Sequence, residues 1–353
     1  SDSFPPQIQL LTGGHPIPDE SSQEAGKAIH QLLLNKSSDE IVIALISGGA
    51  SALVVYPEKD VTLADYRKLT QLLLSCGATI GEINCLRKHI DGFKGGGLLR
   101  WAAPSPIISL ILSDVVNNPL DVIASGPTVP DPTTFQDARK IIEKYDLSLK
   151  IPVSIHNLID QGINKDIQET VKPDDPINNN SLIHLIGSNQ IAAEAAQKAA
   201  KENGILARIL TTSLVGEAGI AGEWLVEMLK KEINSGVQRP FCLIAGGETV
   251  VTLKGNGSGG RNLETALAAV RGLDGLSNVA LITLATDGED GPTDAAGAIV
   301  TGMTLASSLK NGINPDEYLK NNDSYHFWLN TGGMLQIGST GTNVNDLAFL
   351  FAF

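Results

Sequence analysis

The stretch from residue 241 to residue 270 constrains the fold most, because it joins an apolar segment to two glycine clusters and a helix-forming run. Residues 241–245 are short and apolar and are followed directly by glycine, which predicts a buried strand. A second strand is predicted over residues 249–253, and residues 264–270 are rich in strong helix formers. The chain is therefore expected to run from a strand, through the glycine-dense loop 255–260, into the start of a helix.

This glycine-dense loop has the composition of an anion site. Backbone N–H groups at a helix start point toward a bound anion, and glycine lets a ligand approach them closely. Arg261 stands at the predicted helix start and adds a forked positive charge. The loop is not a Walker A motif, because no Lys-Ser or Lys-Thr pair follows the glycines. A plain glycine-rich turn remains the alternative interpretation.

Apolar strands alternate with helical patterns along the whole chain, which indicates an α/β protein with largely parallel sheets. The continuous apolar run 41–46 is typical of a strand that is covered on both faces. It ends in Ser47-Gly48-Gly49, and the strand 241–245 ends in Gly246-Gly247. Ligands of open α/β sheets bind beyond the carboxyl ends of strands. One such end in each half of the chain predicts a cleft lined from both sides.

A basic segment lies at residues 86–97. It contains Arg87, Lys88, His89 and Lys94, and three glycines follow the last of these. A helix that begins at Gly97 would make this segment a second anion site at a helix start. The alternative is a solvated basic face.

Acidic residues gather after two other predicted strands. Residues 279–285 form one strand, and the loop that follows holds four carboxylates: Asp287, Glu289, Asp290 and Asp294. Such charges repel one another unless a cation lies among them, and Mg²⁺ held by one or two of them would explain the cluster. A solvated acidic loop is the alternative. Asp114 follows the strand 106–112 and is interpreted as a metal ligand or base, or as a helix cap.

Length and composition narrow the class of protein. The 353 residues suit two domains, and a polar loop near residues 165–180 is the candidate boundary. The net charge of −13 makes an extended nucleic-acid surface a poor interpretation. No apolar run is long enough to span a bilayer, so no membrane partner is expected. Three cysteines without metal-site spacing indicate a reducing, cytoplasmic compartment.

Taken together, these motifs resemble those of the glycerate 2-kinase family, whose carboxyl-terminal part is the MOFRL domain. The resemblance spans nearly the whole chain and rests on Ser47–Leu53, Arg87–His89 with Lys94–Gly96, Ile123–Thr134, Gly246–Glu264, Thr286–Ala298 and Gly341–Asp346. It implies two α/β domains with the active site between them. The expected division is a Rossmann-like domain over 1–180 and a MOFRL-type domain over 181–353.

The resemblance further implies ATP-dependent phosphorylation of D-glycerate at its 2-hydroxyl, with Mg²⁺. On that basis Arg261 would contact the transferred phosphoryl group or the glycerate carboxylate, and Lys94 would help to hold anionic groups. Asp287 and Asp290 would hold the metal, and Asp114 or Asp287 would orient the hydroxyl. The remaining expected substrate- or nucleotide-binding residues are Ser47, Gly48, Gly49, Ser51, Arg87, Gly246, Gly247, Glu248, Gly257, Gly259, Gly260 and Asn262.

Two other functions stay open at this stage. One is a module that binds a nucleotide or sugar acid without chemistry. The other is a hydroxypyruvate reductase, as members of this family have often been labelled, although no strand–GxGxxG–helix unit with a following acidic residue is present. A homo-oligomer is also left open.

The chain departs from the family pattern in places. Leu263 stands where the family usually has Gln, and Ala50 where it usually has a third glycine. The family also carries a Gly-Lys-Ala motif, with a lysine implied to be catalytic, before the motif that corresponds to His15-Pro16, and nothing here matches it. We therefore expect a truncated form with an uncovered apolar face near residues 1–40, or with that face filled by another chain, and weak catalysis by this chain alone.

Overall fold

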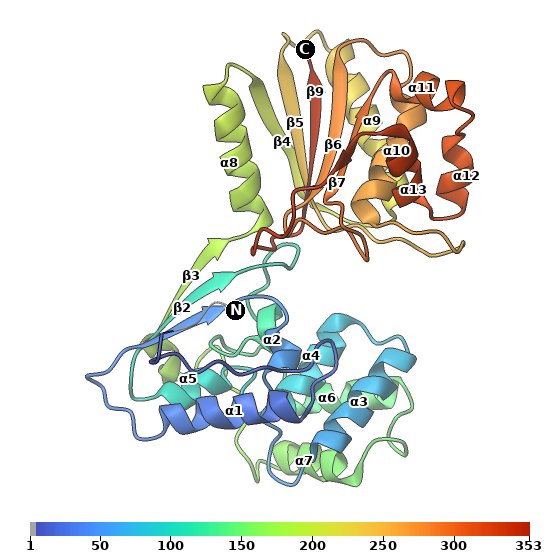
Figure 1. Cartoon of the computed structure of the whole chain (residues 1–353). Helices are drawn as coiled ribbons and strands as arrows, with labels where there is room; N and C mark the ends of the chain where they lie inside the picture. Colours follow the sequence, from blue (N-terminus) through green and yellow to red (C-terminus); the bar gives the residue numbers. More distant parts are fainter. Residues whose placement is uncertain (1–4) are drawn as a thin grey trace. The chain divides into compact units, whose positions relative to one another are not determined.

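The computed structural model describes residues 5–353 and divides into two compact units. Unit 1 runs to Leu112 and resumes over Asn118–Ile186, and unit 2 comprises Ser113–Asn117 and Gly187–Phe353 (Figure 1). The structure places the boundary after Ile186, slightly later than the expected division after residue 180. The reason is β3 (Ser181–Gly187), which joins the sheet of unit 1 instead of opening the second domain.

Unit 1 is built on a three-stranded sheet in the order β1-β2-β3. The strands β1 (Val42–Ile46) and β2 (Ile107–Leu112) are parallel, with Ile43 opposite Ile108. The helical elements of this unit are α1 (Glu20–Leu33), α2 (Ala50–Leu53), α3 (Leu63–Ser75), α4 (Ile80–His89), α5 (Gly97–Ala102), η1 (Ile123–Ser125), α6 (Phe135–Lys144), α7 (Val153–Ile163) and η2 (Pro176–Asn180).

The main core of unit 1 lies among α3, α4, α6 and α7, away from the sheet. One face of β1 is left open, because Ile43 and Leu45 are 64% and 76% exposed. The expectation that this strand is covered on both faces was therefore wrong for the described residues. An apolar cavity of about 330 Å³ lies along α1, β1 and α2. The uncovered apolar face expected near residues 1–40 is present, and it extends onto β1.

Unit 2 is built on a six-stranded sheet in the order β4-β5-β9-β6-β7-β8. The strand β9 is antiparallel to both of its neighbours, β5 and β6, whereas β4 and β5 are parallel. The α/β class is as expected, and the antiparallel strands make this second sheet mixed. The strands are β4 (Leu206–Leu214), β5 (Phe241–Gly247), β6 (Val279–Ala285), β7 (Gly297–Thr301), β8 (Met334–Leu335) and β9 (Asp346–Ala352).

Helices cover both faces of this sheet. The helix α8 (Asn189–Glu202) packs on one face through a small apolar cluster with β4, β5 and β9. The larger core lies on the other face, under α9 (Ala218–Asn234) and α10 (Arg261–Leu273), as Figure 1 shows. The remaining helices of that side are α11 (Thr304–Lys310), α12 (Pro315–Lys320) and α13 (Ser324–Thr331). No helix among residues 5–353 combines the length and apolarity needed to cross a membrane.

The stretch 241–270 follows the prediction at both ends but not in the middle. The strand β5 is buried throughout, and α10 begins at Arg261, directly after the glycine loop. The second strand expected over 249–253 is absent from this part of the described chain, which makes only one isolated bridge, between Val250 and Glu217. Val250 and Leu253 are 56% and 76% exposed, so their β-branched and apolar character is not used for pairing or for burial.

Candidate active site

Arg261 lies at the centre of a group of carboxylates in unit 2. Its Nε and Nη2 donate to the two carboxylate oxygens of Asp346 at 2.5 and 3.0 Å. Its Nη1 lies 3.3 Å from Glu248 Oε1, and the Glu248 carboxylate also accepts from Asn345 at 2.9 Å. The Arg261 side chain keeps 27% of its surface exposed, so a bound anion can still reach it. Two-point pairing fixes the plane of the guanidinium.

The carboxylates outnumber the guanidinium. Burial opposes the charge of Arg261. The hydrogen bonds that Arg261 donates to Asp346, and the charges of Asp346 and Glu248, nevertheless raise its pKa well above the ordinary value. Partial desolvation raises the pKa of Glu248, and the charges of Asp346 and Asp114 add to this rise against the opposing effect of Arg261. Burial likewise raises the pKa of Asp346, with a contribution from Asp287. The group therefore holds negative charge that Arg261 alone does not neutralise.

Asp290, expected to bind a metal, acts as the cap of α10. Its two oxygens accept from the backbone N–H of Asn262 at 3.0 Å and of Leu263 at 2.8 Å, and Asn262 Nδ2 lies 3.3 Å away. The residue is 1% exposed, and burial raises its pKa to about 6 despite these bonds. Asp290 therefore serves the first turn of a helix, and its expected role as a metal ligand stays a prediction.

The glycine loop turns most of its amides inward. The N–H groups of Lys254 and Gly255 donate to Asn322 Oδ1 at 2.6 and 3.0 Å, and that of Gly257 donates to Asn321 O at 2.9 Å. A side chain at Gly257 would lie 2.4 Å from Asp323 Cβ. The expectation that this part of the loop faces an anion was therefore wrong. The amides of Gly259 and Gly260 have no acceptor among the described residues, so they stay available to a ligand.

Gly246 and Gly247 are required for packing. A Cβ at Gly246 would lie 1.9 Å from Asn189 Oδ1, and one at Gly247 would lie 2.2 Å from Leu214 O. Gly247 also has a φ of +149°, in the range that favours glycine. Both residues are buried, so the close approach that requires glycine here is made by the protein itself.

Asp114 and Asp287 lie in the same unit as Arg261. Asp114 belongs to the short segment 113–117 of unit 2, and its charge acts on Glu248. Asp287 is half-buried and accepts from the N–H of Glu289 at 3.1 Å, and its charge acts on Asp346. Two carboxylates from separate strand ends thus add to the negative field around Arg261.

In unit 1, the segment 47–51 forms a turn into the short helix α2. Gly49 has a φ of +81° and precedes the helix, and Ser47 is exposed. Ser51 Oγ makes a short hydrogen bond with Ser125 Oγ, which in turn donates to Asn84 Oδ1 at 3.1 Å. Ser125 has a φ of +60° between two residues that are also left-handed, which marks a strained loop. Gly48 lies between Ser47 and Gly49, so the expected anion-binding residues of this turn are adjacent.

Lys94, expected to hold anionic groups, is buried. Its Nζ donates to Asp91 Oδ2 at 2.7 Å and to the carbonyl of Val54 at 2.9 Å, and the residue is 1% exposed. Burial lowers the pKa of Lys94, although the charge of Asp91 opposes the shift. Arg87 is half-buried, and its Nε has no partner among the described residues. Helix α5 begins at Gly97 as predicted, but the N–H of Gly97 donates to the carbonyl of Lys94 at 2.9 Å.

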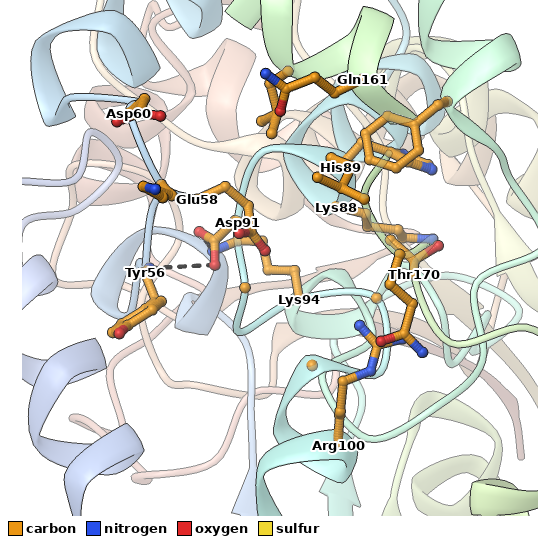
Figure 2. A pocket seen from close by; sticks show the side chains of 18 of the residues that line it. Tyr56, Glu58, Asp60, Lys88, His89, Asp91, Lys94, Arg100, Gln161 and Thr170 are labelled. Atoms are coloured by element: carbon orange, nitrogen blue, oxygen red, sulfur yellow. Dashed lines mark hydrogen bonds and ion pairs between the residues drawn. The ribbon is translucent and has the colours of Figure 1, made fainter. Parts of the chain in front are cut away.

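A cavity of about 530 Å³, hereafter the unit-1 pocket, lies beside the Asp91–Lys94 pair (Figure 2). Its charged and polar lining includes Glu58, Asp60, Lys88, His89, Arg100, Gln161 and Thr170, and its aromatic lining consists of Tyr56, Trp101 and Phe135. Lys88 is buried and lies 3.0 Å from Asp121 and 3.2 Å from Asp131. The basic segment 86–97 therefore folds into an internal ion-pair network, and its interpretation as a solvated basic face was wrong.

Two family models match separate parts of the chain. Residues 2–160 match a domain of unknown function, DUF4147, and residues 241–346 match the MOFRL family. A D-glycerate 2-kinase of Thermotoga maritima is 43% identical over 96% of this chain and 79% of its own length. A glycerate 2-kinase of Pyrococcus horikoshii is 44% identical over 97% of this chain and 77% of its own length.

The chain belongs to the glycerate 2-kinase family. A crystal structure of the glycerate kinase of Thermotoga maritima matches the fold with a TM-score of 0.93, at 42% identity, over all of this chain and 83% of that one. The fold and the order of the motifs are thus those of glycerate 2-kinases.

Sequence reasoning missed several residues that contact the expected site residues of each unit. Asp346 and Asn345 entered only as part of the motif Gly341–Asp346, yet they position Arg261 and Glu248. Ser125 entered only within the motif Ile123–Thr134, yet it bonds to Ser51. A carboxylate directly before an apolar run, as at Asp346, is the signal that would have marked a strand end facing the site.

Proposed function

We propose that this protein is an ATP-dependent kinase that phosphorylates D-glycerate at the 2-hydroxyl and yields 2-phosphoglycerate and ADP. The similarity to a D-glycerate 2-kinase over 96% of the chain carries the proposal. The partly exposed guanidinium of Arg261 supports it, because phosphoryl transfer depends on positioning and on neutralising negative charge.

Arg261 would contact the transferred phosphoryl group or the glycerate carboxylate. Asp346 holds two of its nitrogens, so the guanidinium is oriented before a ligand arrives. A charge that needs no rearrangement during the reaction stabilises a transition state most effectively. The amides of Gly259 and Gly260 begin the same helix, and we assign them to an oxygen of the same anionic group.

In unit 1, the turn formed by Ser47, Gly48, Gly49 and Ser51 would bind a further anionic group of the substrates. The bond between Ser51 and Ser125 orients the Ser51 hydroxyl. Arg87, with its unpartnered Nε, is assigned to binding in the same unit.

The described residues provide only part of the ligand set that a Mg²⁺ site needs. No group of three or more His, Cys, Asp and Glu side chains within residues 5–353 could hold a metal ion, and Asp290 is committed to α10. Mg²⁺ is usually held by one or two carboxylates, with phosphate oxygens and water completing the shell. Asp287, whose charge acts on Asp346, is our candidate ligand. Bound Mg²⁺ would neutralise phosphate charge, and Asp114 or Asp287 would orient the 2-hydroxyl.

The three cysteines support a reducing, cytoplasmic compartment, as proposed from their spacing. Cys76, Cys85 and Cys242 are free thiols, and two of them are buried. Burial raises the pKa of the Cys242 thiol to about 12, so that residue is not a reactive nucleophile.

The proposal is tested by coupling ADP release to NADH oxidation with D-glycerate, ATP and Mg²⁺. D-glycerate should give turnover and L-glycerate should give none, and phosphorus NMR of the product should identify 2-phosphoglycerate. Hydroxypyruvate with NADH serves as the control for a reductase. If ATP and D-glycerate bind in calorimetry but no ADP forms, the protein is a binding module instead.

A further inference from the structure

The wall of the unit-1 pocket carries charged groups of both signs that form no ion pair within the described residues. The buried cations around it are already paired: Lys94 with Asp91, Lys88 with Asp121 and Asp131, and His89 with Glu169. What remains on the wall is the exposed Glu58, Lys59 and Asp60 and the half-buried Arg100, and no ion pair joins Glu58 to Arg100 within the described residues. Figure 2 shows Glu58 beside Asp91, with Arg100 at another edge of the pocket.

Glu58 and Arg100 nevertheless lie within electrostatic reach of each other. Desolvation raises the pKa of Glu58, the charge of Asp91 adds to the rise, and Arg100 opposes it. Burial lowers the pKa of Arg100, and Asp175 and Glu58 oppose that shift. The Glu58 side chain still reaches solvent, so a small molecule can enter between the two charges. A ligand that carries both signs would relieve both desolvation penalties together.

Arg100 is anchored, and Gly92 leaves room for Glu58 at the pocket wall. Arg100 Nη2 donates to the backbone carbonyl of Glu169 at 2.8 Å, which anchors the guanidinium and leaves its other nitrogens for a ligand. Gly92 lets Glu58 approach, since a Cβ there would lie 3.2 Å from Glu58 Oε1 and 3.6 Å from Trp101 Cζ2. The Glu58 carboxylate and the Trp101 indole ring therefore lie near the same point of the pocket wall.

The ring of Trp101 belongs to an aromatic wall. The ring centroids of Tyr56 and Trp101 are 4.9 Å apart, and His30 lies 4.9 and 4.8 Å from them. An ammonium group is stabilised both by a carboxylate and by the faces of aromatic rings. The cavity of about 530 Å³ is larger than its charged pair requires, and Phe135 and Leu158 supply an apolar surface for a side chain.

We propose that the unit-1 pocket binds a free α-amino acid, with its ammonium group at Glu58 and Trp101 and its carboxylate at Arg100. A polyphosphate fits less well than a zwitterion, because the carboxylates of Glu58 and Asp60 face the same space as the cations of Lys59 and Arg100. The residues proposed for phosphoryl transfer in unit 2 do not line this pocket. The inference therefore does not depend on the proposed kinase activity.

The test is isothermal titration of the full chain with L-leucine, without ATP or glycerate. A Kd on the order of 1 mM or tighter is expected, and the fluorescence of Trp101 should change on binding. Two probes each lack one charged group: 4-methylpentanoate has no ammonium, and 3-methylbutylamine has no carboxylate. Each should bind at least about tenfold more weakly than L-leucine, the size of one lost charged contact. A fluorescence change that persists in Trp101→Phe would contradict the assigned position.

Variants separate the two contacts. Glu58→Gln should weaken L-leucine binding about tenfold and leave the affinity for 4-methylpentanoate unchanged, whereas Arg100→Gln should weaken both. Arg100→Gln loses the bond to the Glu169 carbonyl. If it fails to fold, Arg100→Lys, which keeps a positive charge, takes its place in the test. Glu24→Gln and Lys27→Gln, an exposed ion pair on α1, are the matched controls and should bind like the parent. No binding of L-leucine, or equal binding by Glu58→Gln and the parent, would overturn the proposal even if the protein phosphorylates glycerate.

Discussion

Arg261 in unit 2 and Lys94 in unit 1 are both cations paired with an aspartate, and they differ in what the pairing leaves free. Asp346 occupies one edge of a guanidinium whose side chain stays 27% exposed. Asp91 and the carbonyl of Val54 enclose an ammonium that has no exposed surface. A cation that keeps contact with solvent can receive a substrate, whereas an enclosed one stabilises the fold. Residue type and neighbouring glycines therefore do not distinguish the two roles; enclosure does.

Removal of the Lys94 charge should have the largest effect. Lys94→Met leaves Asp91 buried without its cation, and we expect the free energy of unfolding of unit 1 to fall by roughly 3–5 kcal/mol. Urea unfolding followed by the fluorescence of Trp101, which lies in the same unit, measures this. The control is Lys27→Met, because Lys27 pairs with Glu24 at the same spacing of three residues but is exposed. Equal losses in the two variants would refute an enclosed, stabilising Lys94.

The same internal network should make unit 1 sensitive to alkaline pH. Burial opposes the charge of His89, but its bonds to the Cys85 carbonyl and Glu169 raise its pKa from 6.5 to about 9. Because its pKa is raised in the fold, His89 stabilises unit 1 fully below pH 6.5, and this contribution is lost as the pH rises through about 9.

The total loss between these two pH values should approach about 3 kcal/mol. Urea unfolding at a series of pH values should show it, and His89→Gln should make the profile flatter. His156→Gln removes a histidine that is 36% exposed and pairs with Asp160, and it should leave the profile unchanged. A parental profile without a decline above neutral pH would mean that His89 is not charged in the fold.

Substitution of Arg261 should have the smallest effect on the free energy of unfolding and the clearest effect on activity. Arg261→Lys keeps the charge but loses the fork, and we expect kcat/KM for D-glycerate to fall by roughly 10²-fold or more, with little change in the unfolding midpoint. Arg271→Lys is the matched control, because Arg271 lies on the same helix and makes a similar two-point contact with Asp316 at the surface. Parental kinetics for Arg261→Lys would assign Arg261 to the structural class of Lys94.

The structural elements that depend on residues adjacent in the sequence could be predicted from it. The strand β5 and the start of α10 at Arg261 follow from an apolar run and from glycines. The partners of these elements could not be predicted in the same way. Asp290 caps α10 from 28 residues away, and Asn322 binds the loop amide of Gly255 from 67 residues away. No local pattern encodes which distant side chain satisfies a given amide.

The error about Lys94 has the same origin. A basic segment next to glycines is equally consistent with a solvated patch and with an anion site. The observed internal ion-pair network forms because Asp91, Asp121 and Asp131 lie around that segment. The composition allows ion pairs but does not say which acids lie nearby. The continuous apolar run of β1 likewise did not determine whether anything covers Ile43 and Leu45.

The position of β9 has a consequence for the order in which unit 2 is made. This strand is the last described one along the chain, yet it lies between β5 and β6, and its first residue, Asp346, holds Arg261. On a ribosome, β5 and β6 emerge long before the strand that must join them, and contacts so distant in sequence form slowly. Nascent unit 2 must keep those two edges unpaired until β9 arrives. The orientation of Arg261 is therefore among the last features of the protein to be completed during its synthesis.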